Sequence, residues 1–411
     1  MKKARTSDLF TINTYWFGLS TMWNSLHVII LPAILLNFVP ETHKNTYLGL
    51  LTFVGLIIAM VVQPISGSIS DRWRSRWGRR RPLIALGTVV DFIFLALLGW
   101  AGGLVWIAIG YIGLQFTSNI AHGPAQGLLP DKIPPEKHGA ASGIKNLFDM
   151  GGLVAASLIM GNLLDPEAAR PLVPILVIMG ILLVSASVTI LGAREQSSLE
   201  AAPEEPTETE QIPITRILAN NPRYAKLIVS RFAFLIGIYA VQSFAQYFIR
   251  DVIATPNPVK LTGDLMAAIA LPLIAFAVGG GWLGDRLGHR KILYFASGIG
   301  IVGSLALMTA RTPTQVLIYG AILGLGLGLF LTSNWALLSR MAPVAQAGAY
   351  LGLTNLATAG SAASGRLIGP AIDWLNNLNP GAYNGYTAMF AFGAICVLLS
   401  AVLLTRVSEK E

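Results

Sequence analysis

Long apolar stretches recur along the whole chain and constrain its fold more than any other feature. A helix needs about 20 predominantly apolar residues to cross a bilayer, and stretches of this length alternate with short segments that carry Pro, Gly and charge. Each stretch is continuously apolar, and a bilayer accepts only helices or closed barrels. We therefore expect an all-α membrane protein with twelve transmembrane helices. The expected spans are 12–38, 46–70, 82–102, 104–129, 140–164, 171–194, 224–250, 262–284, 290–310, 314–340, 348–373 and 386–405.

The charged residues support this expectation and set the orientation. Only 12% of the residues are charged and 54% are hydrophobic, so the apolar mass must face lipid. If the N-terminus is cytoplasmic, 21 of the 29 Lys and Arg fall in cytoplasmic segments, as the positive-inside rule requires. The net charge of +8 thus reflects membrane insertion, and the expected partner is a lipid bilayer and not a nucleic acid. The predicted location is the cytoplasmic (inner) membrane, multi-pass, with both termini cytoplasmic.

The two sides of a hydrophilic segment at 195–222 repeat each other. This segment contains six Glu among Pro, Thr and Ser, and we predict a flexible cytoplasmic linker there. Three matched segments flank it in the same order, at offsets of 214, 215 and 209 residues. We therefore predict two pseudo-symmetric six-helix bundles, at 1–194 and 223–411. The matches are Gly67, Asp71 and Arg72 with Gly281, Asp285 and Arg286; Thr117 to Asn119 with Thr332 to Asn334; and Gly143, Asn146 and Gly151 with Gly352, Asn355 and Gly360.

Two loop motifs resemble the major facilitator superfamily. After the spans at 46–70 and 262–284, the pattern G-x-x-x-D-R is followed by Gly and basic residues. The string at 62–82 is similar to the sucrose/proton symporters and their relatives, the glycoside-pentoside-hexuronide cation symporters. The string at 123–131 resembles their G-P-x-R-A-L-L-A-D. The resemblance implies the major facilitator fold and transport by alternating access.

The resemblance also implies that these two loops form a gate on the cytoplasmic side. Asp71 ends its span where acyl chains give way to water. A carboxylate there can pair with Arg or with a helix N-terminus, which contributes roughly 0.3–1 kcal/mol. The alternative is that the basic residues only anchor the topology, and this is our interpretation of Arg74, Arg80 and Arg81. The predicted gate residues are Gly67, Asp71, Arg72, Arg76, Gly78, Arg79, Asp285, Arg286 and Arg290.

Polar side chains inside the spans indicate a substrate site. Gln115, Asn119 and His122 share one helical face, and polar groups at bilayer depth usually face a bundle interior or a water-filled path. The resemblance places the first, fourth, seventh and tenth helices around a central cavity. Amides, imidazoles and aromatic rings suit a neutral polyhydroxy ligand; hydrogen bonding between helices is the alternative. The predicted substrate-binding residues are Asn24, His27, Gln115, Asn119, His122, Lys145, Asn146, Asp149, Gln242, Gln246, Asn334 and Trp335.

Lys145 and Asp149 are the sharpest single feature, because they form an i, i+4 pair of opposite charge within one span. The repeat places Thr354 and Thr358 at the equivalent positions, so the scaffold does not require ions there. We favour ligand binding or proton exchange by this pair; a structural salt bridge is the alternative. The predicted proton-coupling candidates are Asp149, Asp91 and His122, and a hydrogen-bonded structural role is an equal alternative for Asp91.

The chain departs from the sucrose symporters at the position of their usual proton acceptor. Gln115 stands where they carry an aspartate, so coupling falls to Asp149 or Asp91, or the protein is a uniporter. We expect a secondary active transporter, not an enzyme, that takes up a neutral sugar or glycoside with a proton as the coupling ion. Export of an amphipathic metabolite or drug, and assembly of membrane pigment–protein complexes, are the alternatives. We expect a monomer without cofactor or metal, since the five His show no metal-ligand spacing.

Overall fold

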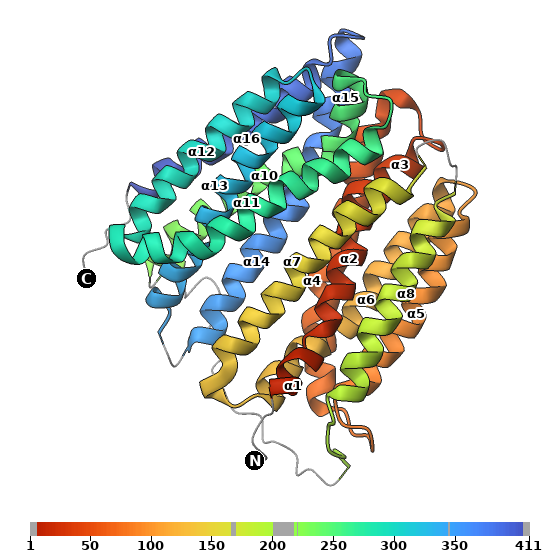
Figure 1. Ribbon diagram of the computed structural model, residues 1–411, viewed down its shortest axis with the longest axis vertical. Helices are drawn as coiled ribbons and strands as arrows, with labels where there is room; N and C mark the ends of the chain where they lie inside the picture. Colours follow the sequence, from red (N-terminus) through yellow and green to blue (C-terminus); the bar gives the residue numbers. More distant parts are fainter. Residues whose placement is uncertain (1–5, 166–169, 200–217, 220, 344–345, 406–411) are drawn as a thin grey trace. The chain divides into compact units, whose positions relative to one another are not determined.

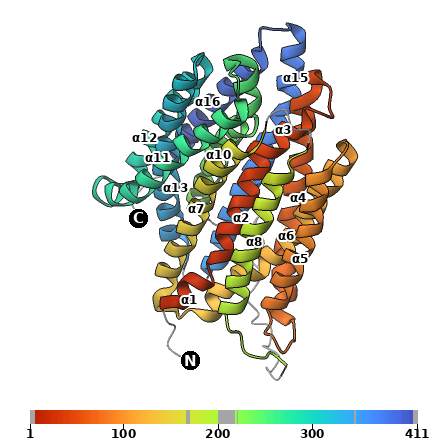
Figure 2. The ribbon, with the colours of Figure 1, turned by 45° about the vertical axis from the view of Figure 1, so that its right-hand side comes forward.

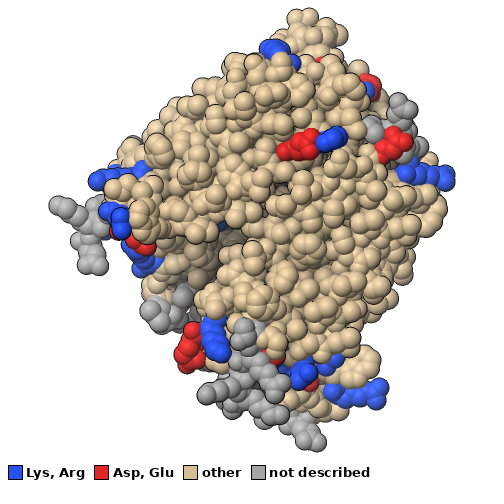
Figure 3. Space-filling view, in the orientation of Figure 1, with Lys and Arg blue, Asp and Glu red and all other residues tan. Residues whose placement is uncertain are grey.

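The computed structural model describes residues 6–165, 170–199, 218–219, 221–343 and 346–405, and these residues are built from helices (Figure 1). Among them, eleven helical stretches are long and apolar enough to cross a membrane. On the face shown in Figure 3, most of the surface carries no charged side chain, as a lipid-facing surface requires. The all-α membrane fold predicted from the sequence is therefore confirmed.

Several helix starts are fixed by local sequence. Pro stands at the first position of three helices, where its missing N–H would have no partner inside the helix, and the residue before it caps the helix. Asn257 accepts a hydrogen bond from the Lys260 amide at 2.8 Å, and Thr312 forms a capping box with Gln315. The three helices with this start are α10 (Pro222–Phe248), α11 (Pro258–Leu287) and α13 (Pro313–Met341).

The chain divides into two compact units. Unit 1 comprises residues 1–39 and 54–207, and unit 2 comprises residues 40–53 and 208–411. The predicted linker at 195–222 lies largely outside the described residues.

Unit 1 is a bundle in which α2 packs against α7 and α8, and α5 packs against α6 and α8 (Figures 1 and 2). In both views α2 runs beside α7. The elements of this unit are α1 (Thr6–Thr11), α2 (Thr14–Asn24), η1 (Ser25–Ile30), α3 (Leu31–Leu35), most of α4 (Lys44–Arg72), α5 (Arg81–Trp100), α6 (Leu104–Lys132), α7 (His138–Leu163) and α8 (Leu172–Gly192).

Unit 2 repeats the pattern, with α10 packed against α14 and α16, and α12 packed against α13 and α16. Its other elements are η4 (Ile249–Ile253), α12 (His289–Thr309), α14 (Ala347–Gly365), η6 (Arg366–Ile368), α15 (Gly369–Leu378) and α16 (Asn384–Leu404). The repeat seen in the sequence extends to side-chain packing. The ring of Phe17 lies 3.6 Å from the position that a Cβ would take on Gly151, and the ring of Phe232 lies 3.5 Å from that position on Gly360.

Helix α4 crosses the boundary between the units. Its first turns belong to unit 2, where Lys44 forms an ion pair with Asp251 at 2.6 Å, and both side chains are 7% exposed. In the same region, Asp373 accepts a hydrogen bond from the Asn45 side chain at 2.8 Å and one from the Thr46 amide at 2.6 Å. A segment that precedes most of unit 1 in sequence is therefore part of the fold of unit 2.

Two predicted spans are interrupted. The span predicted at 12–38 contains the π-helical turn η1 before Pro32, whose ring cannot fit a regular α-helical hydrogen-bond ladder. The span predicted at 348–373 ends as α14 at Gly365, and α15 begins at Gly369. The other ten predicted spans each coincide with one long helix, with ends that differ by a few residues.

Candidate functional site

Lys145 and Asp149 form the ion pair that their spacing predicts, within unit 1. The Lys145 Nζ lies 2.9 Å from the Asp149 carboxylate, and the side chains are 28% and 26% exposed. The same Nζ lies 3.9 Å from the centre of the Trp16 ring, in a cation–π contact. His122 packs edge-on against Trp16, with ring centres 4.9 Å apart. We call Trp16, His122, Lys145 and Asp149 the Lys145 cluster.

Close packing of α2 on α7 positions this cluster. Ser20 donates a hydrogen bond to the Asp149 carbonyl oxygen at 2.6 Å. A Cβ on Gly152 would lie 2.6 Å from the Phe17 carbonyl oxygen, so only glycine permits this approach of the two helices. Asp149 follows the start of α7 by 11 residues, which places it about 16 Å along the helix axis. The ion pair is therefore well inside the span.

A second polar group lies on α2, η1 and α6. His27 Nε2 lies 2.8 Å from the Tyr111 hydroxyl, and the Gln115 side-chain amide donates to the same hydroxyl at 2.7 Å. The His27 ring stacks on Trp23, with centres 5.2 Å apart, and Asn119 donates to the Gln115 carbonyl oxygen at 2.7 Å. We call these five residues the His27 cluster. The π turn that begins at Ser25 carries His27, and π turns are frequent at functional sites.

The structure gathers only some of the predicted substrate-binding residues. Asn24 donates to the Ser20 carbonyl oxygen at 2.8 Å, close to the Lys145 cluster. Asn146 and Trp335 are exposed, and no described contact joins them to either cluster. The remaining three lie in unit 2, where Gln242 is half-buried and Gln246 and Asn334 are buried. The roles of all these residues stay predictions.

Trp23 is one residue of the His27 cluster that the sequence argument missed, and Tyr111 is the other. Tyr111 is fully buried and precedes Gln115 by four residues, so it belongs to the same helical face as Gln115 and Asn119. A search for amides and imidazoles passes over an aromatic hydroxyl, although the spacing alone would have included it.

Asp91 lies apart from both clusters. It is fully buried on α5 and accepts a hydrogen bond from the Thr117 hydroxyl at 2.5 Å, and its Oδ2 has no hydrogen-bond partner among the described residues. Thr88 is on the same helix as Asp91, and its hydroxyl lies 3.0 Å from the Tyr15 hydroxyl. The hydrogen bond from Thr117 is compatible with either role predicted for Asp91.

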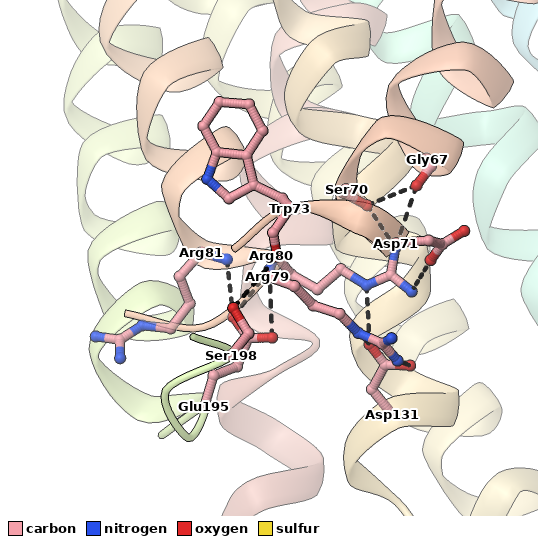
Figure 4. Close-up of polar contacts among 10 residues, drawn as sticks. All are labelled: Gly67, Ser70, Asp71, Trp73, Arg79, Arg80, Arg81, Asp131, Glu195 and Ser198. Carbon is pink, nitrogen blue, oxygen red and sulfur yellow. Dashed lines mark hydrogen bonds and ion pairs between the residues drawn. The ribbon is translucent and has the colours of Figure 1, made fainter. Parts of the chain in front are cut away.

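At the arginine-rich end of unit 1, Arg80 links two acidic residues (Figure 4). Its guanidinium contacts the Asp71 carboxylate at 2.5 Å and the Asp131 carboxylate at 2.8 Å, and it also donates to the Ser70 hydroxyl at 2.5 Å. Arg79 binds Asp131 through two nitrogen atoms, at 2.8 and 3.1 Å. Figure 4 shows the two arginines converging on Asp131. The sequence argument interpreted Arg80 as a topology anchor, whereas the structure makes it the central, buried member of this group.

Other residues of unit 1 fix the backbone around this group. The Glu195 carboxylate accepts hydrogen bonds from the Arg80 and Arg81 amides, at 3.1 and 2.8 Å (Figure 4). Gly78 has φ of 94°, in the left-handed region that favours glycine. A Cβ on Gly123 would lie 2.4 Å from the Gln63 carbonyl oxygen, so α4 and α6 touch through glycine near Gly67.

The other predicted gate residues are arranged differently. Arg72 and Arg76 are exposed, and Arg76 lies over the Trp77 ring at 5.7 Å. In unit 2, Asp285 pairs with Arg340 at 2.8 Å and with His289 at 3.3 Å. Of the two further predicted members, Arg286 lies over the Trp282 ring at 4.1 Å, and Arg290 donates to the distant Thr405 carbonyl oxygen at 3.0 Å.

Comparison with known proteins identifies the family. The family model described as Major Facilitator Superfamily matches residues 9–366 and 258–411. The chain belongs to this superfamily. It is thus a multi-pass membrane transporter of the class predicted from the two loop motifs. A solved structure of the nucleoside transporter NupG has the same fold, with a TM-score of 0.73 and 13% identity over 99% of this chain and 100% of that chain.

Curated relatives of two kinds are among those that match the sequence. The Multi-drug resistance efflux pump PmrA of Streptococcus pneumoniae is 26% identical over 406 residues, which cover 94% of this chain and 93% of that protein. Solute carrier family 45 member 3 of Mus musculus is 29% identical over 149 residues, which cover 33% of this chain and 26% of that protein. The match over nearly the full length is therefore to an efflux pump.

Proposed function

We propose that this transporter exports amphipathic organic compounds by alternating access. The observation that carries the proposal is the Lys145 cluster, in which a partly accessible ion pair lies over the face of Trp16 and His122 packs edge-on against that ring. The aromatic rings offer a surface for the apolar part of a ligand, and the ion pair offers both charges to its polar part. The similarity to an efflux pump over 94% of the chain supports this direction of transport.

Proton coupling fits the same cluster. Asp149 is a partly accessible carboxylate at bilayer depth, and its partner Lys145 lies one helical turn away. Protonation of Asp149 would remove the carboxylate that a positive or hydrogen-bond-donating group of the ligand could bind, so the ligand and the proton would compete for Asp149. We propose that an inward proton gradient drives export through this competition.

Binding of fluorescent amphipathic dyes to the purified protein tests the proposed site. We expect Trp16→Leu to weaken dye binding about 10-fold or more, because it removes the aromatic face beside Lys145. Trp106→Leu is the matched control, since Trp106 is exposed near the start of α6 and belongs to neither cluster. Equal loss of binding in the two variants would count against the site.

Uptake of a neutral sugar or glycoside with protons is the second candidate function. The His27 cluster favours it, because an imidazole, a phenol and two amides both donate and accept hydrogen bonds, as sugar hydroxyls require. The similarity to the sucrose symporters at 62–82 and the partial match to Solute carrier family 45 member 3 point the same way.

Transport into proteoliposomes separates the two candidates. Export predicts that an imposed proton gradient moves dye against its concentration gradient in the direction opposite to the protons, and that sucrose and simple glycosides neither bind nor compete. Sugar uptake predicts that protons enter together with the sugar, and that Gln115→Leu reduces this proton entry. Dye transport that is unchanged when the proton gradient is collapsed would eliminate the coupling in the first proposal.

We propose that the arginine-rich end of unit 1 faces the cytoplasm, in keeping with the positive-inside rule. Trp77 is exposed in the loop beside Arg76 and Gly78. In a Cys396→Ser background, we expect Trp77→Cys to react with a membrane-impermeant maleimide in inverted membrane vesicles and not in intact cells. Labelling in intact cells would instead place the arginine-rich end of unit 1 outside the cell and the opposite end in the cytoplasm.

A further inference from the structure

Arg231 is a buried cation inside unit 2. It is 6% exposed and follows the start of α10 by nine residues, about 14 Å along the helix axis. Its Nε donates to the Thr358 hydroxyl at 2.9 Å, and one terminal nitrogen donates to the Asn334 Oδ1 at 2.9 Å. Both partners are neutral, so neither balances the charge of the guanidinium.

The acidic residues of the described part of unit 2 are engaged elsewhere. Residues 222–404 contain four of them, and residues 40–53 contain one, Glu41. Glu41 forms ion pairs with Lys44 and Arg250. The four acidic residues in 222–404 also have partners: Asp251 pairs with Lys44, Asp264 with Lys260 and Asp285 with Arg340, and Asp373 accepts a hydrogen bond from Asn45. Within the described residues of this unit, no ion pair to Arg231 is formed.

The internal repeat shows that the acid beside the cation of unit 1 has no counterpart at the equivalent position of unit 2. The equivalent contacts of Phe17 with Gly151 and of Phe232 with Gly360 align α2 with α10. The residue before each Phe is Trp16 in one unit and Arg231 in the other. In unit 1 the cation near this position is Lys145, and Asp149 balances it. Unit 2 keeps a cation but has Thr358 where unit 1 has the acid.

A second, independent feature lies beside the guanidinium. Asn334 is fully buried, and its Nδ2 has no hydrogen-bond partner among the described residues, although its Oδ1 binds Arg231. The two atoms share one carbon, so this unpaired donor lies next to the Arg231 head group. A buried donor without a partner is unfavourable, and an acceptor on a ligand would satisfy it.

We propose that Arg231, with Asn334 beside it, binds an anionic group, a carboxylate or a phosphate, on the transported compound. A guanidinium stays charged and presents a planar set of donors that matches the two oxygens of such a group. In a low-dielectric span the anion would supply the charge balance that unit 2 lacks. This inference rests on the proposed function and narrows it: the exported compounds include amphipathic acids.

Calorimetric titration with a matched pair of probes tests the subsite. The probes are 1-naphthylacetic acid and its amide, which share one aromatic body and differ in charge. We expect the purified wild type to bind the acid about 10- to 100-fold more tightly than the amide. Arg231→Gln should abolish this preference, and Arg231→Lys should retain part of it. Arg223→Gln is the control, since Arg223 is exposed near the start of the same helix.

Retained binding of the amide by Arg231→Gln shows that this variant is folded. Equal affinity of the wild type for acid and amide, or a preference that persists in Arg231→Gln, overturns the proposal. If neither probe binds, the proposed export of amphipathic compounds fails. The anion subsite is then tested separately, with simple anions. Benzoate or inorganic phosphate should then raise the melting temperature of the wild type, relative to chloride at equal ionic strength, and not that of Arg231→Gln; equal shifts overturn the subsite.

A third arm separates a soluble substrate from a lipid headgroup. The titrations are repeated in detergent with and without added phosphatidylglycerol. Acid binding that is strong without this lipid supports the substrate assignment. Arg231-dependent stabilisation by the lipid, together with no preference for the acid in its absence, assigns the subsite to the lipid phosphate and overturns the proposal.

Discussion

At the scale of single residues, the Lys145–Asp149 pair places two charges where a membrane span normally avoids them. Removal of one partner leaves the other charge uncompensated, whereas removal of both leaves a neutral span. We expect Asp149→Asn and Lys145→Gln each to lower the melting temperature of the purified protein. The double variant should lose less stability than the sum of the two, with a coupling of about 1–3 kcal/mol.

A double-mutant cycle on an exposed ion pair provides the control for this experiment. Lys260 and Asp264 are also an i, i+4 pair, but their side chains are 49% and 37% exposed. Exposed pairs of this kind contribute about 0.3–0.5 kcal/mol. Additive effects of Asp149→Asn and Lys145→Gln, indistinguishable from those at Lys260 and Asp264, would show that solvent screens the inner pair as well.

The same scale shows what the sequence could and could not supply. Opposite charges four residues apart in one span predict their own contact, because helix geometry alone brings Lys145 and Asp149 together. The partners of Arg80 and Arg231 come from other helices, and no local spacing encodes them. For this reason the sequence argument interpreted Arg80 as an anchor and did not identify Thr358 and Asn334 as the partners of Arg231.

At the scale of helices, Arg80 connects the end of α4 to the end of α6. One guanidinium contacts Asp71 on the first helix and Asp131 on the second. Lysine keeps the charge but cannot reach two carboxylates and the Ser70 hydroxyl together. We expect Arg80→Lys to cost about 1–3 kcal/mol of stability in thermal denaturation of the purified protein.

Arg76→Lys is the matched control for Arg80→Lys. It makes the same chemical change at an exposed arginine of the same loop, where the described contact is with the Trp77 ring. We expect a change within about 0.5 kcal/mol. If the two variants were equally stable, the link between α4 and α6 would contribute nothing measurable, and anchoring would be the better account of Arg80.

Helix positions were predicted well for a physical reason. A bilayer requires a continuous apolar run for each span, so hydrophobicity alone locates most helices to within a few residues. The interruptions at η1 and between α14 and α15 depend on how Pro32 and Gly369 fit their neighbours. A Cβ on Gly369 would lie 2.3 Å from the Asn45 carbonyl oxygen, a contact that only the folded structure reveals.

At the scale of the whole molecule, the halves of the sequence and the two compact units do not coincide. Sequence repeats place the boundary after the sixth span, yet residues 40–53 belong to unit 2. Repeats report common ancestry of the halves and cannot show that one helix contributes its two ends to different units. The N-terminal half of the chain therefore carries a segment, residues 40–53, that packs in unit 2.

Expression of the chain as two fragments, 1–207 and 208–411, tests whether unit 2 depends on this segment. We expect the fragments to copurify from detergent, because the Lys44 region of the first supplies buried partners to the second. Asp251→Asn would remove the buried carboxylate that pairs with Lys44 and leave it only the exposed Glu41, a change that we expect to cost about 1–3 kcal/mol. Recovery of the complex should then fall at least about 10-fold, whereas Asp264→Asn, in the exposed pair with Lys260, should leave it unchanged. Undiminished copurification of the Asp251→Asn fragment, at matched expression, would mean that other contacts hold the fragments together and that residues 40–53 are dispensable to unit 2.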